Sequence, residues 1–292
     1  MKTILVLTDF SINADYAAHY ALKFAQKIEA NLLLCNIYTV PPNDRNPDPK
    51  VWPPGRHEEE SIEDLGELLA RLKTQIDAGP ESDFRPEINQ CSEEGLVQDI
   101  INEVAAKNNI FMAIISMHSA CYLSTIFSEN HTKDIIEHAN FPVLIIPYQV
   151  RYKDYKTIAF ATDLAETDTD VLRSLSTLAS YSDSEILITN VSNDDSAARE
   201  EEKSLKQFFG QEVLKINNPK ILYKAIKSKS VGDSLRWLSQ HVEIDMVVLV
   251  HRKQNLFQKI TEGSVIKKMA DHPAKPLLIF PYSTVAEVLP VF

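Results

Sequence analysis

A basic segment near the end of the chain is followed by a glycine and a serine, a combination that could bind phosphate. Arg252 and Lys253 follow an apolar run, and Gly263-Ser264 precede a segment with helical periodicity, Val265 to Asp271. Glycines let a backbone approach phosphate oxygens, and the N-terminus of the next helix adds inward-pointing N–H groups and a favourable dipole. The pattern is compatible with an anion site, but a solvated basic loop is the interpretation that it favours.

Other groupings of reactive side chains lack the spacing that catalysis or metal binding needs. His131 and His138 stand seven residues apart on a predicted helix, which is too far for joint ligation, and no carboxylate–histidine signature completes a set. The serines near His118 have no Gly-x-Ser-x-Gly elbow and nothing to form an oxyanion hole. We therefore expect neither a metal site nor a catalytic triad.

The elements that position these residues occur twice in the sequence. Lys2 to Phe10 and Lys156 to Leu164 both read as Lys-Thr, an apolar strand and then Thr-Asp, which ends at Asp9 and Asp163. Four further pairs of segments follow in the same order, namely 31–37 with 185–191, 94–100 with 231–237, 113–116 with 246–249 and 141–148 with 275–282. Five ordered matches indicate a duplication.

The expected strands are nearly continuous apolar runs, as in 141–148, and helical segments such as 14–28 and 168–180 separate them. Burial on both faces and crossover helices are typical of parallel sheets. We predict an α/β fold with two tandem doubly wound parallel-sheet domains, over residues 1–148 and 155–283. The connection from Gln149 to Tyr155 is too short for the domains to lie far apart.

Charge and composition narrow the classes of partner. The net charge of −11 falls entirely in residues 1–148, which hold 11 basic and 22 acidic residues, while residues 149–292 hold 19 of each. Binding to a phosphate backbone requires a basic excess, so we expect no nucleic-acid partner.

No segment resembles a membrane span or a secretory signal. The apolar runs 141–147 and 244–250 are far shorter than the roughly 20 residues that cross a bilayer, and the first nine residues lack a cleavage site. Cys35, Cys91 and Cys121 lack metal-ligand spacing and are interpreted as buried small hydrophobes in a reducing compartment. We expect a cytoplasmic protein that does not contact membranes.

The strand that ends in Asp, the parallel α/β domain and the final Pro-Val-Leu strand at 142–144 resemble the universal stress protein (UspA-like) family. The resemblance covers nearly the whole chain, in a tandem two-domain form. It implies an adenine nucleotide alpha hydrolase-like, Rossmann-like fold. In that family a nucleotide is held by the Asp after strand one and by a G-x2-G-x9-G-S/T motif after strand four.

Carried over to the second half, the resemblance implies a cofactor-binding set that keeps only part of the glycine motif. Its members are Asp163, Val250, Lys253, Gly263 and Ser264.

In the first half the motif positions are Met117, Ala120, Asn130 and His131, with no glycine retained, and only Asp9 matches. We therefore expect the first half to bind no triphosphate. Since Asp after a strand is also a common N-cap or turn residue, a structural role for Asp9 and Asp163 stays open.

The resulting hypothesis is a non-enzymatic stress-response or regulatory module that needs no cofactor. The alternative is a protein that binds ATP or another adenine nucleotide in its second domain only. We expect the last strands of the two domains, Val143 to Ile146 and Leu277 to Phe280, to form an intramolecular pseudo-dimer contact, because edge strands seek pairing. A homodimer of whole chains stays open. The proline-rich segment 40–55 is interpreted as a surface loop, with a lid or partner contact as the alternative.

Overall fold

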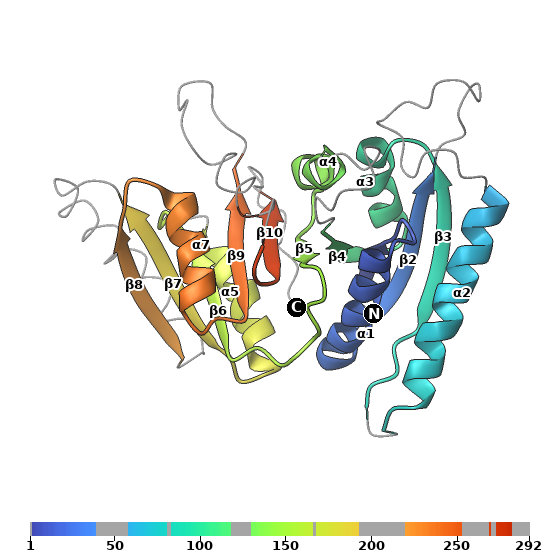
Figure 1. Ribbon diagram of the computed structural model, residues 1–292, viewed down its shortest axis with the longest axis horizontal. Coiled ribbons are helices and arrows are strands. Elements are labelled where there is room, and N and C mark those ends of the chain that lie inside the picture. Colours follow the sequence, from blue (N-terminus) through green and yellow to red (C-terminus); the bar gives the residue numbers. More distant parts are fainter. Residues whose placement is uncertain are drawn as a thin grey trace. The chain divides into compact units, whose positions relative to one another are not determined.

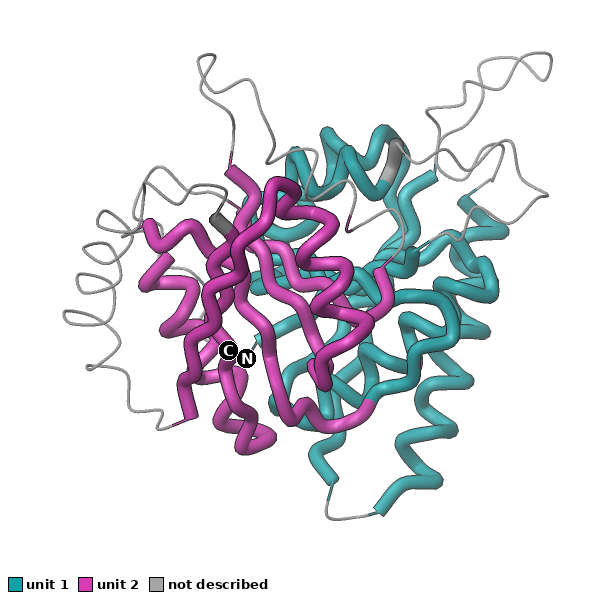
Figure 2. The backbone as a smooth tube through the Cα atoms, turned by 60° about the vertical axis from the view of Figure 1, so that its left-hand side comes forward, with its two compact units in different colours: residues 1–152 teal, residues 153–292 magenta. Residues whose placement is uncertain are grey.

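The chain forms two compact units, residues 1–152 and 153–292 (Figure 2). The computed structural model describes residues 2–38, 58–80, 83–117, 130–165, 168–192, 220–252, 269 and 273–281. The proline-rich segment 40–55 and the helix expected over 197–209 lie outside these residues.

Unit 1 alternates strands and helices along the sequence (Figure 1). Its elements are β1 (Thr3–Leu7), α1 (Ile12–Ile28), β2 (Asn31–Tyr38), α2 (Glu58–Asp77), β3 (Ile88–Glu94), α3 (Val97–Lys107), β4 (Ile110–Ser116), α4 (Asn130–His138) and β5 (Val143–Ile146). The strands are ordered β3-β2-β1-β4-β5, and all four neighbouring pairs are parallel.

Unit 2 repeats this arrangement. Its described elements are β6 (Thr157–Ala161), α5 (Asp168–Ser180), β7 (Glu185–Ser192), β8 (Ile221–Lys227), α7 (Val231–His241), β9 (Met246–His251) and β10 (Leu277–Pro281). The strands are ordered β8-β7-β6-β9-β10, again with parallel pairs throughout. The predicted fold class of two tandem doubly wound parallel-sheet domains is confirmed.

The core of each unit is the sheet and the helix faces that cover it. In β1, Ile4, Leu5 and Val6 have no exposed surface, and Ile158 and Phe160 have none in β6. Such strands read as continuous apolar runs because helices cover both faces of a parallel sheet. Among the described residues, no helix is long and apolar enough to cross a membrane.

Local sequence explains where several elements begin and end. The Ser11 hydroxyl caps α1 by accepting a hydrogen bond from the Ala14 backbone N–H at 3.2 Å. Gly95, between β3 and α3, has φ 142°, and a Cβ there would lie 2.5 Å from the Ile100 side chain, so this turn requires glycine. Strand β5 is shorter than the expected 141–148 segment, which contains Pro142 and Pro147, residues without a backbone donor.

Candidate functional site

The strand order reverses between β1 and β4 in unit 1 and between β6 and β9 in unit 2. Ligands of open α/β sheets bind at such a switch point, outside the carboxyl ends of the strands. Asp9 follows β1 and Asp163 follows β6, so both aspartates stand at a switch point. The candidate site in each unit is therefore the turn that carries the aspartate and whatever lies opposite it.

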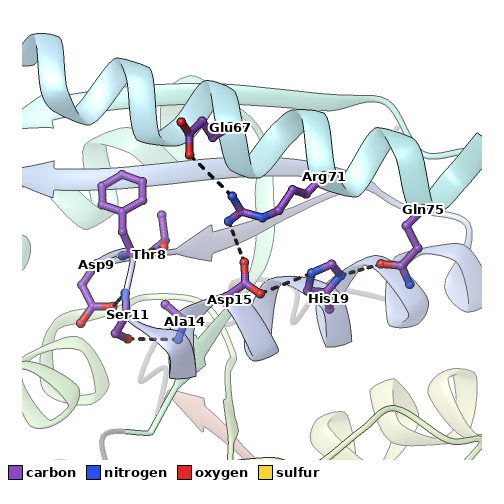
Figure 3. A network of polar contacts seen from close by, with 10 residues as sticks. Thr8, Asp9, Ser11, Ala14, Asp15, His19, Glu67, Arg71 and Gln75 are labelled. Atoms are coloured by element: carbon purple, nitrogen blue, oxygen red, sulfur yellow. Dashed lines mark hydrogen bonds and ion pairs between the residues drawn. The ribbon is translucent and has the colours of Figure 1, made fainter.

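The turn after β1 is held by two side chains of its own (Figure 3). The Thr8 hydroxyl accepts a hydrogen bond from the Phe10 backbone N–H at 3.0 Å. The Asp9 carboxylate accepts one from the Ser11 N–H, also at 3.0 Å. One carboxylate oxygen of Asp9 thus contributes to the turn, and the whole residue is buried.

The turn after β6 is built in the same way. The Thr162 hydroxyl accepts a hydrogen bond from the Leu164 N–H at 2.8 Å, and the Asp163 carboxylate accepts one from the Ala165 N–H at 3.3 Å. The structural role that sequence alone left open for these aspartates therefore exists in both copies.

Both turns place a large residue in the left-handed backbone region. Phe10 has φ 60° and Leu164 has φ 65°. This region is costly for a bulky side chain, and such strain persists only where surrounding contacts enforce it. The paired bonds from Thr and Asp are the contacts that enforce it here.

An asparagine on the neighbouring strand supports each turn. Asn36 of β2 donates its side-chain amide to the Thr8 carbonyl at 2.7 Å, and Asn190 of β7 donates to the Thr162 carbonyl at 2.9 Å. In unit 1 the Asn36 oxygen also accepts a hydrogen bond from the Ser61 hydroxyl of α2 at 2.8 Å. Sequence reasoning missed this role, although the same asparagine in both copies was a usable signal.

The two units differ in what lies opposite the turn. In unit 2, Arg252 follows β9 and its guanidinium contacts two carboxylates, that of Asp163 at 2.5 Å and that of Asp168 at 2.8 Å. The second oxygen of Asp168 accepts a hydrogen bond from the Thr162 hydroxyl at 2.5 Å. We call Thr162, Asp163, Asp168 and Arg252 the Arg252 cluster.

The charges of the Arg252 cluster are unevenly shielded from water. The Asp168 residue is 1% exposed, whereas the Asp163 side chain is 54% exposed. Burial raises the pKa of Asp168 from 3.8 to about 6, against the opposing effects of the Arg252 charge and the Thr162 hydrogen bond. With both carboxylates ionised the cluster carries a net charge of −1, which disfavours a phosphate.

In unit 1 an uncharged hydrogen bond joins α1 to the end of β4 at the switch point. The Asn13 side chain, in the first turn of α1, donates to the carbonyl of Met117 just after β4, at 3.2 Å. The first motif position predicted for this half, Met117, is thus part of a link between α1 and the end of β4.

A charged network lies farther along α1 and joins it to α2 (Figure 3). Arg71 contacts Asp15 at 2.8 Å and Glu67 at 3.9 Å, and His19 lies 3.4 Å from Asp15 and 2.5 Å from the Gln75 oxygen. The Arg71 side chain is 51% exposed, and exposed ion pairs contribute about 0–1 kcal/mol each. This network links two helices that already pack together.

The predicted cofactor-binding set is described only in part. Asp163 lies in the Arg252 cluster, and Val250 lies within β9 opposite Phe280 of β10. Lys253, Gly263 and Ser264 lie outside the described residues. Of the first-half positions, Asn130 and His131 begin α4, and Ala120 is not among the described residues.

The described part of the chain has no group of side chains that could hold a metal ion. There, no three or more His, Cys, Asp or Glu side chains come together as a possible metal site. Of the histidines considered from sequence, His138 ends α4 with its ring nitrogen 2.8 Å from the Asp134 carbonyl, which is a contact within its own helix.

Two solved structures share this architecture over nearly the whole chain, and a third matches less than half of it. A universal stress protein from Archaeoglobus fulgidus DSM 4304 matches with a TM-score of 0.71 and 13% identity, over 96% of this chain and 98% of that chain. A universal stress protein of Pseudomonas aeruginosa UCBPP-PA14 matches with a TM-score of 0.60 and 13% identity, over 96% and 92%. A universal stress protein in complex with cAMP matches with a TM-score of 0.33 and 17% identity, over 44% and 98%.

No curated protein matches this chain. The model of the universal stress protein family, in contrast, matches it twice, over residues 1–147 and 153–281. The chain therefore belongs to the universal stress protein family and carries two family domains in tandem.

Proposed function

We propose that this tandem universal stress protein is a non-enzymatic regulatory module of the stress response whose nucleotide-binding loops are degenerate. The observation that carries the proposal is the Arg252 cluster. The aspartate that the family resemblance assigns to the nucleotide, Asp163, is already paired with a cation from its own chain. A ligand would have to displace that cation or bind around it.

The electrostatics of the cluster support this reading. Arg252 also neutralises the buried Asp168, so moving the guanidinium toward a phosphate would leave a buried carboxylate without its partner. Breaking a buried charge pair by removing one partner costs about 3–5 kcal/mol. Nucleotide binding here would have to overcome that cost.

Unit 1 supports the same reading by other means. The Asp9 carboxylate caps its own turn, and the four positions that the family motif would occupy hold no glycine. A side chain at such a position would occupy the space that a phosphate needs, and no residue there has the backbone freedom of glycine.

We also propose that the tandem domains pair through their last strands. Val143–Ile146 and Leu277–Phe280 are buried and apolar, and each lies at the end of the strand order of its own unit. A strand at the edge of a sheet presents unpaired backbone groups to a further strand, so pairing within one chain would protect both edges. Residues 1–148 and 155–283 remain the domain limits that we propose.

A thermal-shift experiment with the full chain tests the proposal. We expect millimolar ATP with Mg²⁺ to leave Tm unchanged. A ligand present at 100 times its Kd stabilises the native state by about 2.7 kcal/mol, so binding would raise Tm by several degrees. A rise in Tm with ATP that tripolyphosphate does not produce would contradict the proposal.

The alternative, adenine-nucleotide binding by the second domain, is favoured by the surviving Gly263-Ser264 pair. It predicts a rise in Tm that Gly263→Glu abolishes. The matched substitution in the first domain, Asn130→Glu, should leave that rise intact. Loss of the rise in both variants would point to general destabilisation instead of a lost phosphate contact.

A further inference from the structure

Two cysteines face each other on neighbouring strands of unit 1. Cys35 of β2 and Cys91 of β3 are direct partners in the parallel register. Directly opposed residues of a parallel pair point to the same face, at the strand spacing of about 4.8 Å. Disulfides join residues whose Cα atoms lie roughly 4.4–6.8 Å apart, so these two positions meet that requirement.

The next pair in the register defines the opposite face. Asn36 is the partner of Ser92, and both lie beside the Ser61 hydroxyl of α2, which is 2.6 Å from that of Ser92. Because side chains alternate along a strand, the two thiols lie on the face away from Ser61. They therefore form a pair of their own, separate from this polar group.

The two thiols are unequally accessible. Cys35 is fully buried, whereas Cys91 is partly exposed on β3, the strand at the end of the order in unit 1. The pKa of Cys35 is raised well above its usual value, mainly by a hydrogen bond with the Cys91 thiol and to a lesser extent by burial. Cys91 is therefore the thiol that a dissolved oxidant meets first.

The second copy shows that packing alone does not require this pair. At the position equivalent to Cys35, β7 has Thr189, and its partner on β8 is Lys224. The same fold thus accepts a hydroxyl and an amine at these two places. The fold therefore does not explain why unit 1 has cysteines at both positions.

We propose that Cys35 and Cys91 are a reversible dithiol–disulfide site that is oxidised by low-molecular-weight peroxides. The Cys91 thiol loses its proton and attacks one peroxide oxygen as a thiolate. The O–O bond breaks, a sulfenic acid forms on Cys91, and the released hydroxide takes up the proton to give water. The Cys35 sulfur, as its proton leaves, then attacks the Cys91 sulfur, and the S–O bond breaks to release a second water. In total, two thiols are oxidised by two electrons and one hydrogen peroxide is reduced to two waters.

The disulfide would tie β3, at the end of the strand order of unit 1, to its neighbour β2. It would close a loop from residue 35 to residue 91, which includes the whole of α2. Closing a long loop stabilises a fold by lowering the entropy of its unfolded chain. We expect oxidation to raise the Tm of unit 1 by about 5 °C or more.

The test uses the full chain with Cys121→Ser, which leaves only these two thiols. After treatment with hydrogen peroxide, we expect the intact mass to fall by two hydrogen atoms. Neither cysteine should then react with an alkylating reagent in denaturant, and a peptide map should join the segments that contain Cys35 and Cys91. Dithiothreitol should restore both thiols.

Two further variants, each in the Cys121→Ser background, keep the outcome decisive. Cys91→Ser replaces the partly exposed thiol and should prevent the loss of mass, while Cys35→Ser should let Cys91 gain oxygen or form a dimer of chains. A wild-type pair that gains oxygen atoms without an internal cross-link would overturn the proposal. So would disulfide-linked dimers of the Cys121→Ser chain as the main product.

Discussion

The two copies share a strand-to-helix turn but differ in the contact made opposite it. In unit 1 the neutral side chain of Asn13 reaches the end of β4, whereas in unit 2 the charged Arg252 lies between two carboxylates. The turn itself has the same hydrogen bonds and the same left-handed residue in both. The comparison teaches that this joint is a requirement of the fold, while the contact opposite it is free to change.

The largest expected effect comes from removing the cation of the Arg252 cluster. Arg252→Ala leaves Asp168 buried without its guanidinium, and we expect a loss of about 3 kcal/mol at pH 8. Arg71→Ala breaks an exposed network in unit 1 and should cost less than about 1 kcal/mol. Urea unfolding followed by far-UV circular dichroism, which reports on both units, compares the two variants.

The pH dependence of that loss sharpens the comparison. The pKa of Asp168 is raised from 3.8 to about 6 in the folded state, so the folded chain holds this proton more tightly than the unfolded chain. Its contribution to stability is complete below about pH 4 and is lost as the pH rises through about 6. Without Arg252 the pKa should rise further, so Arg252→Ala should cost little at pH 5. An equal loss at pH 5 and pH 8 would contradict this account.

A smaller difference is expected between the two supporting asparagines. Asn36→Ala removes hydrogen bonds to both Thr8 and Ser61 in a fully buried position, and we expect a loss of about 2–3 kcal/mol. Asn190→Ala removes the corresponding bond to Thr162 and should cost about 1–2 kcal/mol. Unfolding curves of the two variants test the order. A greater loss for Asn190→Ala would break the proposed equivalence of the turns.

The smallest effect concerns a left-handed residue in the turn after the first helix of each unit. Glu29 and Asp183 occupy equivalent positions with φ 55° and 52°, a region that glycine adopts without strain. Glu29→Gly should therefore stabilise unit 1 by about 0.5–1 kcal/mol. Asp183→Gly should gain less, because it also removes the ion pair with Lys220. An equal gain in the two variants, measured by Tm, would show that this pair contributes nothing.

The sequence was sufficient to predict the architecture because its signals are local and occur twice. Apolar runs such as Leu32–Ile37 predict buried parallel strands, and the matched Thr-Asp ends reveal the duplication without any structure. Helix α5 begins at Asp168 and ends at Ser180, as its periodicity predicted. Such periodic segments depend little on distant contacts.

The candidate site was less predictable because its contacts join residues far apart in the chain. Arg252 was recognised as a source of positive charge, but its pairing with Asp163 depends on β6 and β9 being neighbours. From the sequence, Asp168 was only the first residue of a predicted helix, and its burial became visible only in the folded chain. The contacts that a side chain makes depend on the tertiary structure, and residue type and spacing do not specify them.

The duplicated turn also bears on how such sequences are compared. An aspartate that caps its own strand-to-helix joint contributes to folding, whether or not a ligand ever reaches it. A lineage can therefore lose a binding activity while its alignment column stays unchanged. In an alignment of such chains, the position of Arg252 is more informative than that of the aspartate. The residue there decides whether Asp163 is paired within the chain or is open to a ligand.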